Sequence, residues 1–477
     1  MKSEFIKNLD FASDAATAKQ RANLYDAAVG FFETQADEMR EKILNTPNTE
    51  EIYEITGTKY YVSVDGNDGN DGKSPESAIK TLERIHALEL NYGDAVLFKR
   101  GDTFRFGRTI NAVNGVTYGS YGEGCKPKIY GSPENYAEND TWQEVKPNIW
   151  KIDFPYPNAC GCVIDHSRIV GVLKLATEKM RENGDYFHDV ENKVFYLYCD
   201  EGKPNEVLTD IEIMPSFTLL HGPKGSKDLI IDNLCLKYTA AFAFSTSLFK
   251  GNLQFTNCES GFVGGKWVRG IGGNRYGNAV EFWLGAEDVK IENNWFYQTY
   301  DSAVSWQGNL AGFAYKNISF SKNLFEYNNC DIEFFSRGGP VHNFVMADNI
   351  MRFTSMGWGS RTFDGGYRGI EGCIRACTDN REEPMDVKDN YFTNNILDCP
   401  ARQTINWNII PHQREEIHAS GTKLYIKGKY RTLIPCLQGL QYDLETEAHD
   451  RRFACNYREL VKEFPRFEEG ADIYWED

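Results

Sequence analysis

Three short stretches of the sequence decide the expected fold. Residues 277–283 read GNAVEFW, residues 301–307 read DSAVSWQ and residues 329–335 read NCDIEFF. They align without gaps, and apolar side chains recur at every second position, which is the period of a β-strand. Repeated strands of this kind predict that one face of each strand packs into a core while the other face points outward.

The alternation sorts the aligned side chains into two sets. The inward set is Asn278, Ser302, Cys330, Val280, Val304, Ile332, Phe282, Trp306 and Phe334. The outward set is Ala279, Ala303, Asp331, Glu281, Ser305, Glu333, Trp283, Gln307 and Phe335. One outward column across the three strands therefore reads Glu281, Ser305, Glu333.

An asparagine recurs at the ends of short strands between about residue 227 and residue 400. The recurring residues are Asn233, Asn257, Asn294, Asn323, Asn349 and Asn390. Their successive gaps of 24, 37, 29, 26 and 41 residues have the length of one solenoid coil with loops of variable size. Because asparagine tolerates the left-handed backbone conformation, we expect it at each tight turn, with its side chain bonded to the neighbouring coil.

The segment before the repeats contains two recognisable stretches of sequence. Residues 59–85 read KYYVSVDGNDGNDGKSPESAIKTLERI, and residues 92–105 read YGDAVLFKRGDTFR. This opening resembles that of right-handed parallel β-helix proteins of the pectate-lyase-like superfamily. The resemblance rests on this opening and on the repeated short strands, and it covers about residues 58–400. It implies an all-β solenoid in a carbohydrate-active enzyme. It identifies no specific family, and no family's active-site residues are carried over.

The two ends of the chain differ from the repeats. Residues 4 to about 50 predict an amphipathic helix, because Leu24, Ala28, Phe32, Met39 and Ile43 recur at helical spacing. This helix is expected to pack on the rest of the chain; the alternative is that it joins copies of the chain in a homo-oligomer. We expect three parts: a helical segment 1–57, a β-helix 58–420 and a capping segment 421–477 that covers the open end of the solenoid.

Composition excludes some classes of partner. The net charge of −17 argues against nucleic acid, whose phosphates require a basic surface. No run of about 18 apolar residues is present, so no membrane partner is expected.

The first residues lack the apolar stretch of a secretory signal, which favours a cytoplasmic location unless a leader has been trimmed. The 12 cysteines fit no standard zinc spacing and are expected to be reduced thiols, so no metal site is predicted.

The outward acids are the candidate catalytic residues. Strands stand about 4.8 Å apart, so the backbones of Glu281 and Glu333, two coils apart, are about 9–10 Å apart. Asp331 and Glu333 lie two residues apart on one strand, about 6.5–7 Å. Both values are near the carboxyl separation of inverting glycosidases, about 6.5–9.5 Å. We predict Glu281 and Glu333 as the acid/base pair, with Asp331 or Asp301 as alternates; Asp301 with Glu333 would allow a shorter, retaining separation.

Neighbouring side chains suit a sugar. Aromatic rings stack on sugar faces, and amides and cations bond to hydroxyls. The predicted substrate-binding residues are Trp283, Gln307, Arg275, Arg337, His342 and Phe335. The resulting expectation is a glycoside hydrolase that acts on oligosaccharides from the chain end without a cofactor.

Two alternatives remain open from the sequence. The first is a polysaccharide lyase, or a related uronate epimerase, with Lys266, Arg269 or Arg275 as the base and Ca²⁺ bound by Asp331 and Glu333. The second is a solenoid that binds glycans without catalysis; replacing Glu281 or Glu333 by Gln would then leave affinity unchanged.

Overall fold

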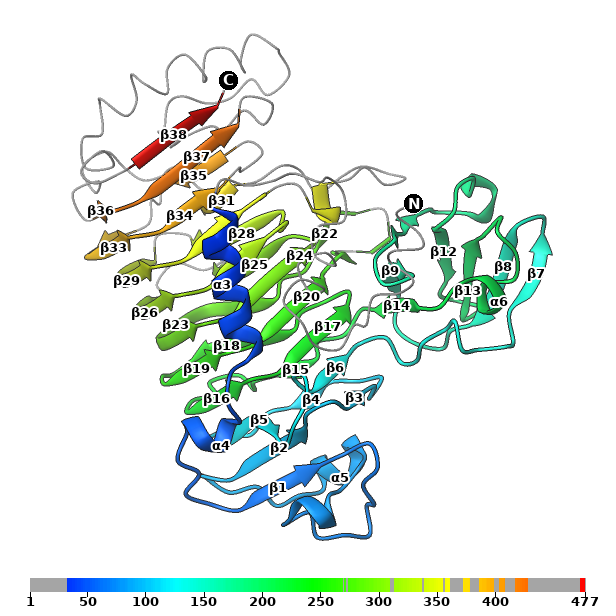
Figure 1. Ribbon diagram of the computed structural model, residues 1–477, viewed down its shortest axis with the longest axis horizontal. Helices are drawn as coiled ribbons and strands as arrows, with labels where there is room; N and C mark the ends of the chain where they lie inside the picture. The colour runs from blue at the N-terminus through cyan, green and yellow to red at the C-terminus, as the bar shows by residue number, and fades with distance from the viewer. Residues whose placement is uncertain are drawn as a thin grey trace.

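The computed structural model describes residues 32–268, 270–271, 273–308, 313–336, 339–354, 357–360, 372–377, 386–398, 403–407, 417–427 and 472–476. Within these residues the chain winds into successive coils whose strands pair in parallel with the equivalent strands of the next coil (Figure 1). The predicted parallel β-helix is therefore confirmed.

Three ladders of parallel strands form the walls of the β-helix. The site ladder consists of β4 (Ile110–Asn111), β15 (Leu220–His221), β18 (Phe244–Phe249), the first half of β23 (Val280–Glu292), β25 (Ser302–Gly308), β28 (Cys330–Ser336), β31 (Gly372–Cys377) and β35 (Gln403–Trp407). The second ladder consists of β1 (Lys59–Val62), β2 (Ala95–Lys99), β5 (Thr117–Tyr121), β16 (Leu229–Asp232), β19 (Leu253–Thr256), the second half of β23, β26 (Tyr315–Ser321), β29 (Pro340–Ala347), β33 (Asn390–Thr393) and β36 (Ile417–Ser420).

The third ladder closes the solenoid. It consists of β3 (Thr103–Phe104), β6 (Lys128–Tyr130), β17 (Cys235–Thr239), β20 (Glu259–Val263), β24 (Trp295–Thr299), β27 (Leu324–Glu326), β30 (Ile350–Arg352), β34 (Ile396–Asp398), β37 (Lys423–Lys427) and β38 (Asp472–Glu476). Strands β37 and β38 of the segment 421–477 thus extend this ladder, and the rest of that segment beyond residues 421–427 and 472–476 lies outside the described residues.

Apolar side chains from the three ladders fill the interior. The aligned residues Phe282, Trp306 and Phe334 stack in register, with ring centroids 5.6 and 5.3 Å apart and planes within 15° of parallel. Each coil alone would leave these rings in water, and stacking buries them in one continuous core.

Asparagines link the coils, as predicted, but only some of them are the left-handed residue. Asn323 accepts hydrogen bonds from the backbone N–H and the side-chain amide of Asn294 and donates to Asn349, and Asn349 in turn donates to Asn395. In this ladder the left-handed residue is the one before the asparagine, for example Lys322 with φ +55°. Asn233 and Asn257 are themselves left-handed, at φ +60° and +55°. The ladder continues through Asn395, and Asn390 instead bonds to the neighbouring coil through the Val341 oxygen.

Replacing Asn323 by Ala is expected to lower the free energy of unfolding by about 2–4 kcal/mol, because it leaves the buried N–H of Asn294 and the C=O of Ile291 without their partner. Equilibrium unfolding in urea measures the change. The control is Asn192→Ala, whose amide bonds only exposed Asp189 and which should change stability by less than about 0.5 kcal/mol. Equal effects of the two substitutions would contradict the ladder's contribution.

The N-terminal helix packs along the outer face of the third ladder. Helix α3 (Glu33–Leu44) runs across successive coils, and the short helix α4 (Thr49–Ile52) follows it (Figure 1). Ala36, Arg40 and Ile43, at helical spacing, are buried against strand residues such as Trp295 and Leu324. The predicted packing of this helix on the chain is observed for the described part; residues 1–31 lie outside it.

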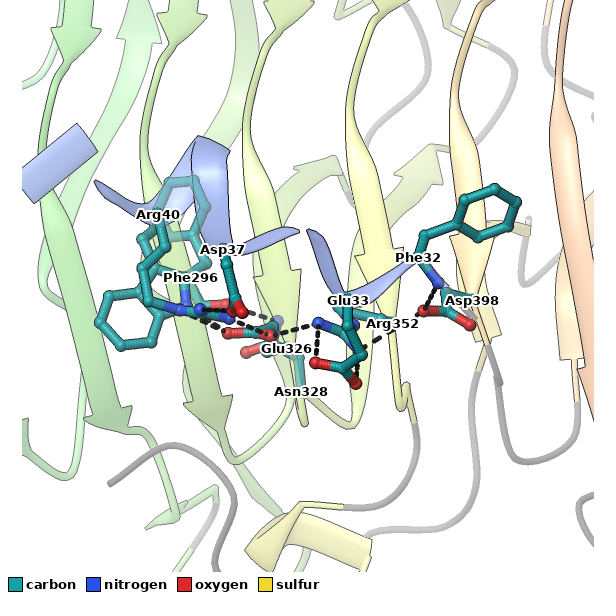
Figure 2. A network of polar contacts seen from close by, with 10 residues as sticks. Phe32, Glu33, Asp37, Arg40, Phe296, Glu326, Asn328, Arg352 and Asp398 are labelled. Atoms are coloured by element: carbon teal, nitrogen blue, oxygen red, sulfur yellow. Dashed lines mark hydrogen bonds and ion pairs between the residues drawn. The ribbon is translucent and has the colours of Figure 1, made fainter. Parts of the chain in front are cut away.

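A buried ionic network fastens α3 to the coils (Figure 2). The Arg40 guanidinium donates to both carboxylate oxygens of Glu326, at 2.6 and 3.3 Å. Arg352, on the next coil, bonds to Glu33 of the helix and lies 3.3 Å from Glu326 and 3.5 Å from Asp398. Both guanidiniums are fully buried, so each charge depends on these carboxylates for compensation.

An insertion interrupts the solenoid between β6 and β15. Its strands are β7 (Gln143–Lys146), β8 (Ile149–Asp153), β9 (Ala159–Ile164), β10 (Ile169–Val170), β11 (Val172–Leu173), β12 (Asp185–Asp189), β13 (Val194–Tyr198) and β14 (Ile211–Pro215). They form two small sheets around a separate core and project to one side (Figure 1). Among the described residues no helix is long and apolar enough to cross a membrane.

Candidate functional site

The predicted acidic column lies on the outer side of the site ladder. Strand register places Ser245, Glu281, Ser305, Glu333 and Arg375 on successive rungs. The intervening residues, such as Val280 and Val304, are in the core. The predicted assignment of faces is therefore confirmed for the column and for core residues such as Val280 and Val304.

The assignment is wrong at the entry to the strands. Ala279 and Ala303, predicted to face outward, belong to the core. Asn278 and Ser302, predicted to face inward, reach Glu281 and Glu333. Because β23 starts at Val280 and β25 at Ser302, these residues precede or begin their strands, where simple alternation does not apply.

The column is also covered, which the sequence did not indicate. Side chains of Glu281 and Ser305 are fully buried, and Glu333 is 3% exposed. A hairpin of β21 (Lys266–Trp267) and β22 (Arg275–Tyr276) lies near Glu281. Gly277, at φ +141°, lets the hairpin rejoin β23, because a Cβ there would lie 2.6 Å from the Ala241 oxygen.

A cavity of about 600 Å³ opens beside the column. Two of the predicted acids, Asp301 and Glu333, line it, together with the predicted sugar-binding residues Trp283 and Gln307. Glu281 is not among the lining residues. It lies behind them, close enough for the charges of Asp301 and Glu333 to act on it.

Glu333 is surrounded by hydrogen-bond donors. Its Oε2 accepts hydrogen bonds from Ser305 Oγ at 2.9 Å and from Gln307 Nε2 at 3.1 Å, and Ser302 Oγ lies at 3.4 Å. Arg375 bonds to Oε1 at 3.3 Å. Hydroxyl, amide and guanidinium groups thus contact both oxygens of this side chain.

Glu281 has the opposite environment. Burial raises its pKa well above the ordinary value, and the nearby carboxylates of Glu333 and Asp301 raise it further. A hydrogen bond from Asn278 and the charge of Lys266 act in the other direction. Burial and like charge therefore favour the protonated form of Glu281.

The remaining predicted residues divide into those near the cavity and those away from it. Arg275 lines the cavity, but its guanidinium donates to the backbone oxygens of Gly265 and Cys160 and lies 4.5 Å from the Tyr300 ring centroid. The hairpin is thereby tied to the insertion. His342 is on β29 of the second ladder, where it bonds Asp386 at 2.9 Å, and it does not line the cavity. Arg337, Arg269 and the side chain of Phe335 lie outside the described residues.

Asp331 does not face the cavity. Its Oδ1 accepts a hydrogen bond from Asn328 at 3.0 Å, and its Oδ2 accepts one from Thr354 at 2.5 Å. It shares no hydrogen-bond partner with Glu333 among the described residues. Burial, only partly offset by these two bonds, raises its pKa to about 7.

This environment predicts a pH-dependent contribution to stability. A carboxyl group whose pKa rises from 3.8 to about 7 on folding favours the folded state below pH 3.8 and loses that contribution as the pH rises toward 7. Asp331→Asn removes the titration while keeping the shape. We expect the melting temperature of the variant, relative to the unsubstituted protein, to increase between pH 4 and pH 8. Parallel melting curves across this range would contradict the prediction.

Sequence reasoning missed two residues of the site, Arg375 and Asn278. Arg375 pairs in register with Glu333, and extending the alignment by one coil to GCIRAC at 372–377 would have found it. Asn278 lies three residues before Glu281, and the same spacing in Asn328 and Asp331 was a usable signal.

No protein-family model matches the chain, and no curated protein matches it. Solved structures similar in fold include XylC in complex with xylose, at 12% identity and TM-score 0.44, covering 79% of this chain and 86% of that one. A family 28 exopolygalacturonase of Yersinia enterocolitica has 11% identity and TM-score 0.42, with 80% and 69% covered. A rhamnogalacturonan lyase has 11% identity and TM-score 0.39, with 78% and 73% covered. The parallel β-helix itself follows from the strand pairing of the three ladders.

Proposed function

We propose that the protein is a carbohydrate-active enzyme, a glycoside hydrolase that cleaves oligosaccharides from the chain end. The observation that supports this most strongly is that two carboxyl groups of one column have opposite surroundings. Burial and like charge raise the pKa of Glu281 and so favour its protonated form, whereas hydrogen-bond donors and Arg375 surround Glu333. An acid and a base set apart in this way are the two groups that glycoside hydrolysis requires.

In the proposed reaction Glu281 gives its proton to the glycosidic oxygen as the bond to the anomeric carbon breaks. Glu333 takes a proton from the water molecule whose oxygen bonds to that carbon. Backbones two rungs apart, about 9–10 Å, are compatible with the inverting class, whose carboxyl groups are about 6.5–9.5 Å apart. Glu281 would have to turn into the cavity to reach the substrate, so Asp301, which already lines it, is the alternative donor.

The cavity suits a short saccharide. Its lining includes Trp283 on β23, Gln307 on β25, Glu333 on β28 and Arg375 on β31. These four rungs span about 15 Å along the axis of the β-helix. The half-buried indole of Trp283 offers a ring face to one sugar, and Gln307 can bond to hydroxyls.

One observation favours the lyase alternative. The pKa of Lys266 is lowered by burial, although the charge of Glu281 raises it in part, and its Nζ lies 4.2 Å from the ring centroid of Phe242. A lysine with a lowered pKa is suited to abstract a proton. In that reaction the glycosidic bond would break by elimination, with no water added.

Product analysis in water enriched in ¹⁸O tests the proposal. Neutral and uronate-containing oligosaccharides are incubated with the protein, with and without EDTA, and the products are weighed by mass spectrometry. We expect ¹⁸O in the released sugar and no effect of EDTA. Unlabelled products that absorb in the ultraviolet as unsaturated uronates would instead establish a lyase. Saturable binding of a panel sugar without any product would favour the glycan-binding alternative.

Donor assignment needs a second comparison. Glu281→Gln and Asp301→Asn are assayed on substrates whose leaving groups differ in acidity. The variant that lacks the true donor should lose activity mainly on substrates with poor leaving groups, because a good leaving group departs without protonation.

A further inference from the structure

The two carboxylate oxygens of Glu281 are not equivalent. Asn278 Nδ2 donates to Oε2 at 2.5 Å. Oε1 is buried and has no hydrogen-bond partner among the described residues. The orientation of the Asn278 amide is fixed, because its Oδ1 accepts the backbone N–H of Ser302 at 2.9 Å. Nδ2 therefore cannot exchange places with Oδ1, and Oε2 always meets a donor.

This arrangement decides where the proton of Glu281 sits. An oxygen that accepts an N–H bond is the carbonyl oxygen of a carboxylic acid, so the O–H must be on Oε1. The groups whose charge acts on this acid, or on which it acts, are Lys266 on β21, Tyr276 on β22, Asp301 before β25, Tyr315 on β26 and Glu333 on β28. Lys266 is the cation among them, and the two carboxylates outnumber it, which favours the protonated form.

A second asparagine, Asn328, bonds to an acid three residues later in the same way, but the second oxygen of that acid has a different environment. Asn328 Nδ2 donates to Asp331, three residues later, and its Oδ1 accepts the backbone N–H of Thr299 at 3.0 Å. However, the second oxygen of Asp331 accepts a bond from Thr354. Asp331 therefore has hydrogen-bond partners on both oxygens, whereas Oε1 of Glu281 has none among the described residues.

We propose that Asn278 is the positioning residue of the proton donor Glu281, and that it orients the donor by fixing the proton on Oε1. The inference rests on the proposed function, in which Glu281 is the acid. Without Asn278 the proton could reside on either oxygen, and the carboxyl group could rotate. Only part of the population would then present the proton correctly.

The test compares Asn278→Asp with the unsubstituted protein on the oligosaccharide that is cleaved fastest. The variant keeps the oxygen that accepts from Ser302 but replaces the donor to Glu281. We expect kcat to fall about 10- to 100-fold with little change in KM. Since the Asn278 bond lowers the pKa of Glu281, its loss should move the alkaline limb of the pH–rate profile to higher pH.

The matched control is Asn328→Asp, which changes the equivalent asparagine beside Asp331. It should leave the alkaline limb in place. An unshifted limb in Asn278→Asp, or an equal shift in Asn328→Asp, would overturn the proposal. Should Asn278→Asp fail to fold, Asn278→Ala is measured in its place, with the same expectation and Asn328→Ala as its control.

Infrared difference spectroscopy of the protein without sugar tests the positioning role of Asn278 separately from the proposed glycoside hydrolase activity. Glu281→Gln should remove a protonated-carboxyl band at neutral pH, and Asn278→Ala should move that band to higher frequency as the carbonyl oxygen loses its donor. If the band behaves in this way but no glycoside is cleaved, the positioning of Glu281 stands and the proposed function fails. If Glu281→Gln removes no such band, the positioning proposal is overturned whatever the activity.

Discussion

Glu333→Gln is expected to lower kcat/KM for oligosaccharide cleavage by about 10³- to 10⁴-fold, which corresponds to about 4–5.5 kcal/mol of transition-state stabilisation. Gln has the shape of Glu but cannot take a proton from water. It also removes the carboxylate that lies 3.3 Å from Arg375. Initial rates of sugar release, measured with product calibration, give the change.

The matched control is His342→Ala. His342 was predicted to bind substrate, but it lies on the second ladder and bonds Asp386 outside the cavity. This variant should retain activity within about twofold, because neither ring nitrogen touches the proposed site. If Glu333→Gln kept more than about a tenth of the activity, Glu333 could not be the base, and the role would pass to Asp301.

Arg352→Ala is expected to lower the free energy of unfolding by about 3–5 kcal/mol. The substitution removes a fully buried guanidinium that contacts Glu33, Glu326 and Asp398. Asp398 is itself fully buried, and a carboxylate left there without its cation is costly. Urea unfolding followed by tryptophan fluorescence measures the change, because Trp295 lies in the same cluster.

Lys290→Ala is the control for this measurement. Lys290 also forms an ion pair, with Glu292, but its side chain is 47% exposed, and pairs of this kind contribute about 0–1 kcal/mol. A loss in Arg352→Ala no larger than that of Lys290→Ala would mean that the network does not hold α3 in place.

The fold could be predicted because its signals are local and repeated. Alternation over GNAVEFW and its two counterparts was enough to place Val280 inside and Glu281 outside. The repeat of asparagines indicated the coil length correctly. The left-handed residue Lys322 was missed because lysine carries no turn signal, and Asp348 was missed because the asparagine next to it was taken as the turn residue.

The site was predicted only in part. Glu333, Trp283 and Gln307 followed from strand alternation, which is a property of a few consecutive residues. The burial of Glu281 depends on a hairpin whose path over the column is set by long-range contacts, such as that of Arg275 with Cys160. No local pattern contains that information. The same reason explains why Arg40 and Arg352 were not recognised as partners of one network.

The sequence separations within the network bear on how the chain is made. The backbone N–H of Phe32 bonds to Asp398, 366 residues later, and Arg40 bonds to Glu326, 286 residues later. A ribosome adds about 5–20 residues per second, so roughly 20–70 s pass between the synthesis of Phe32 and that of Asp398. During this interval the apolar face of α3, with Ala36 and Ile43, has no complete surface to dock on. Helix α3 can therefore form its buried contacts only after the later coils have been synthesised. It docks late although it is translated before them.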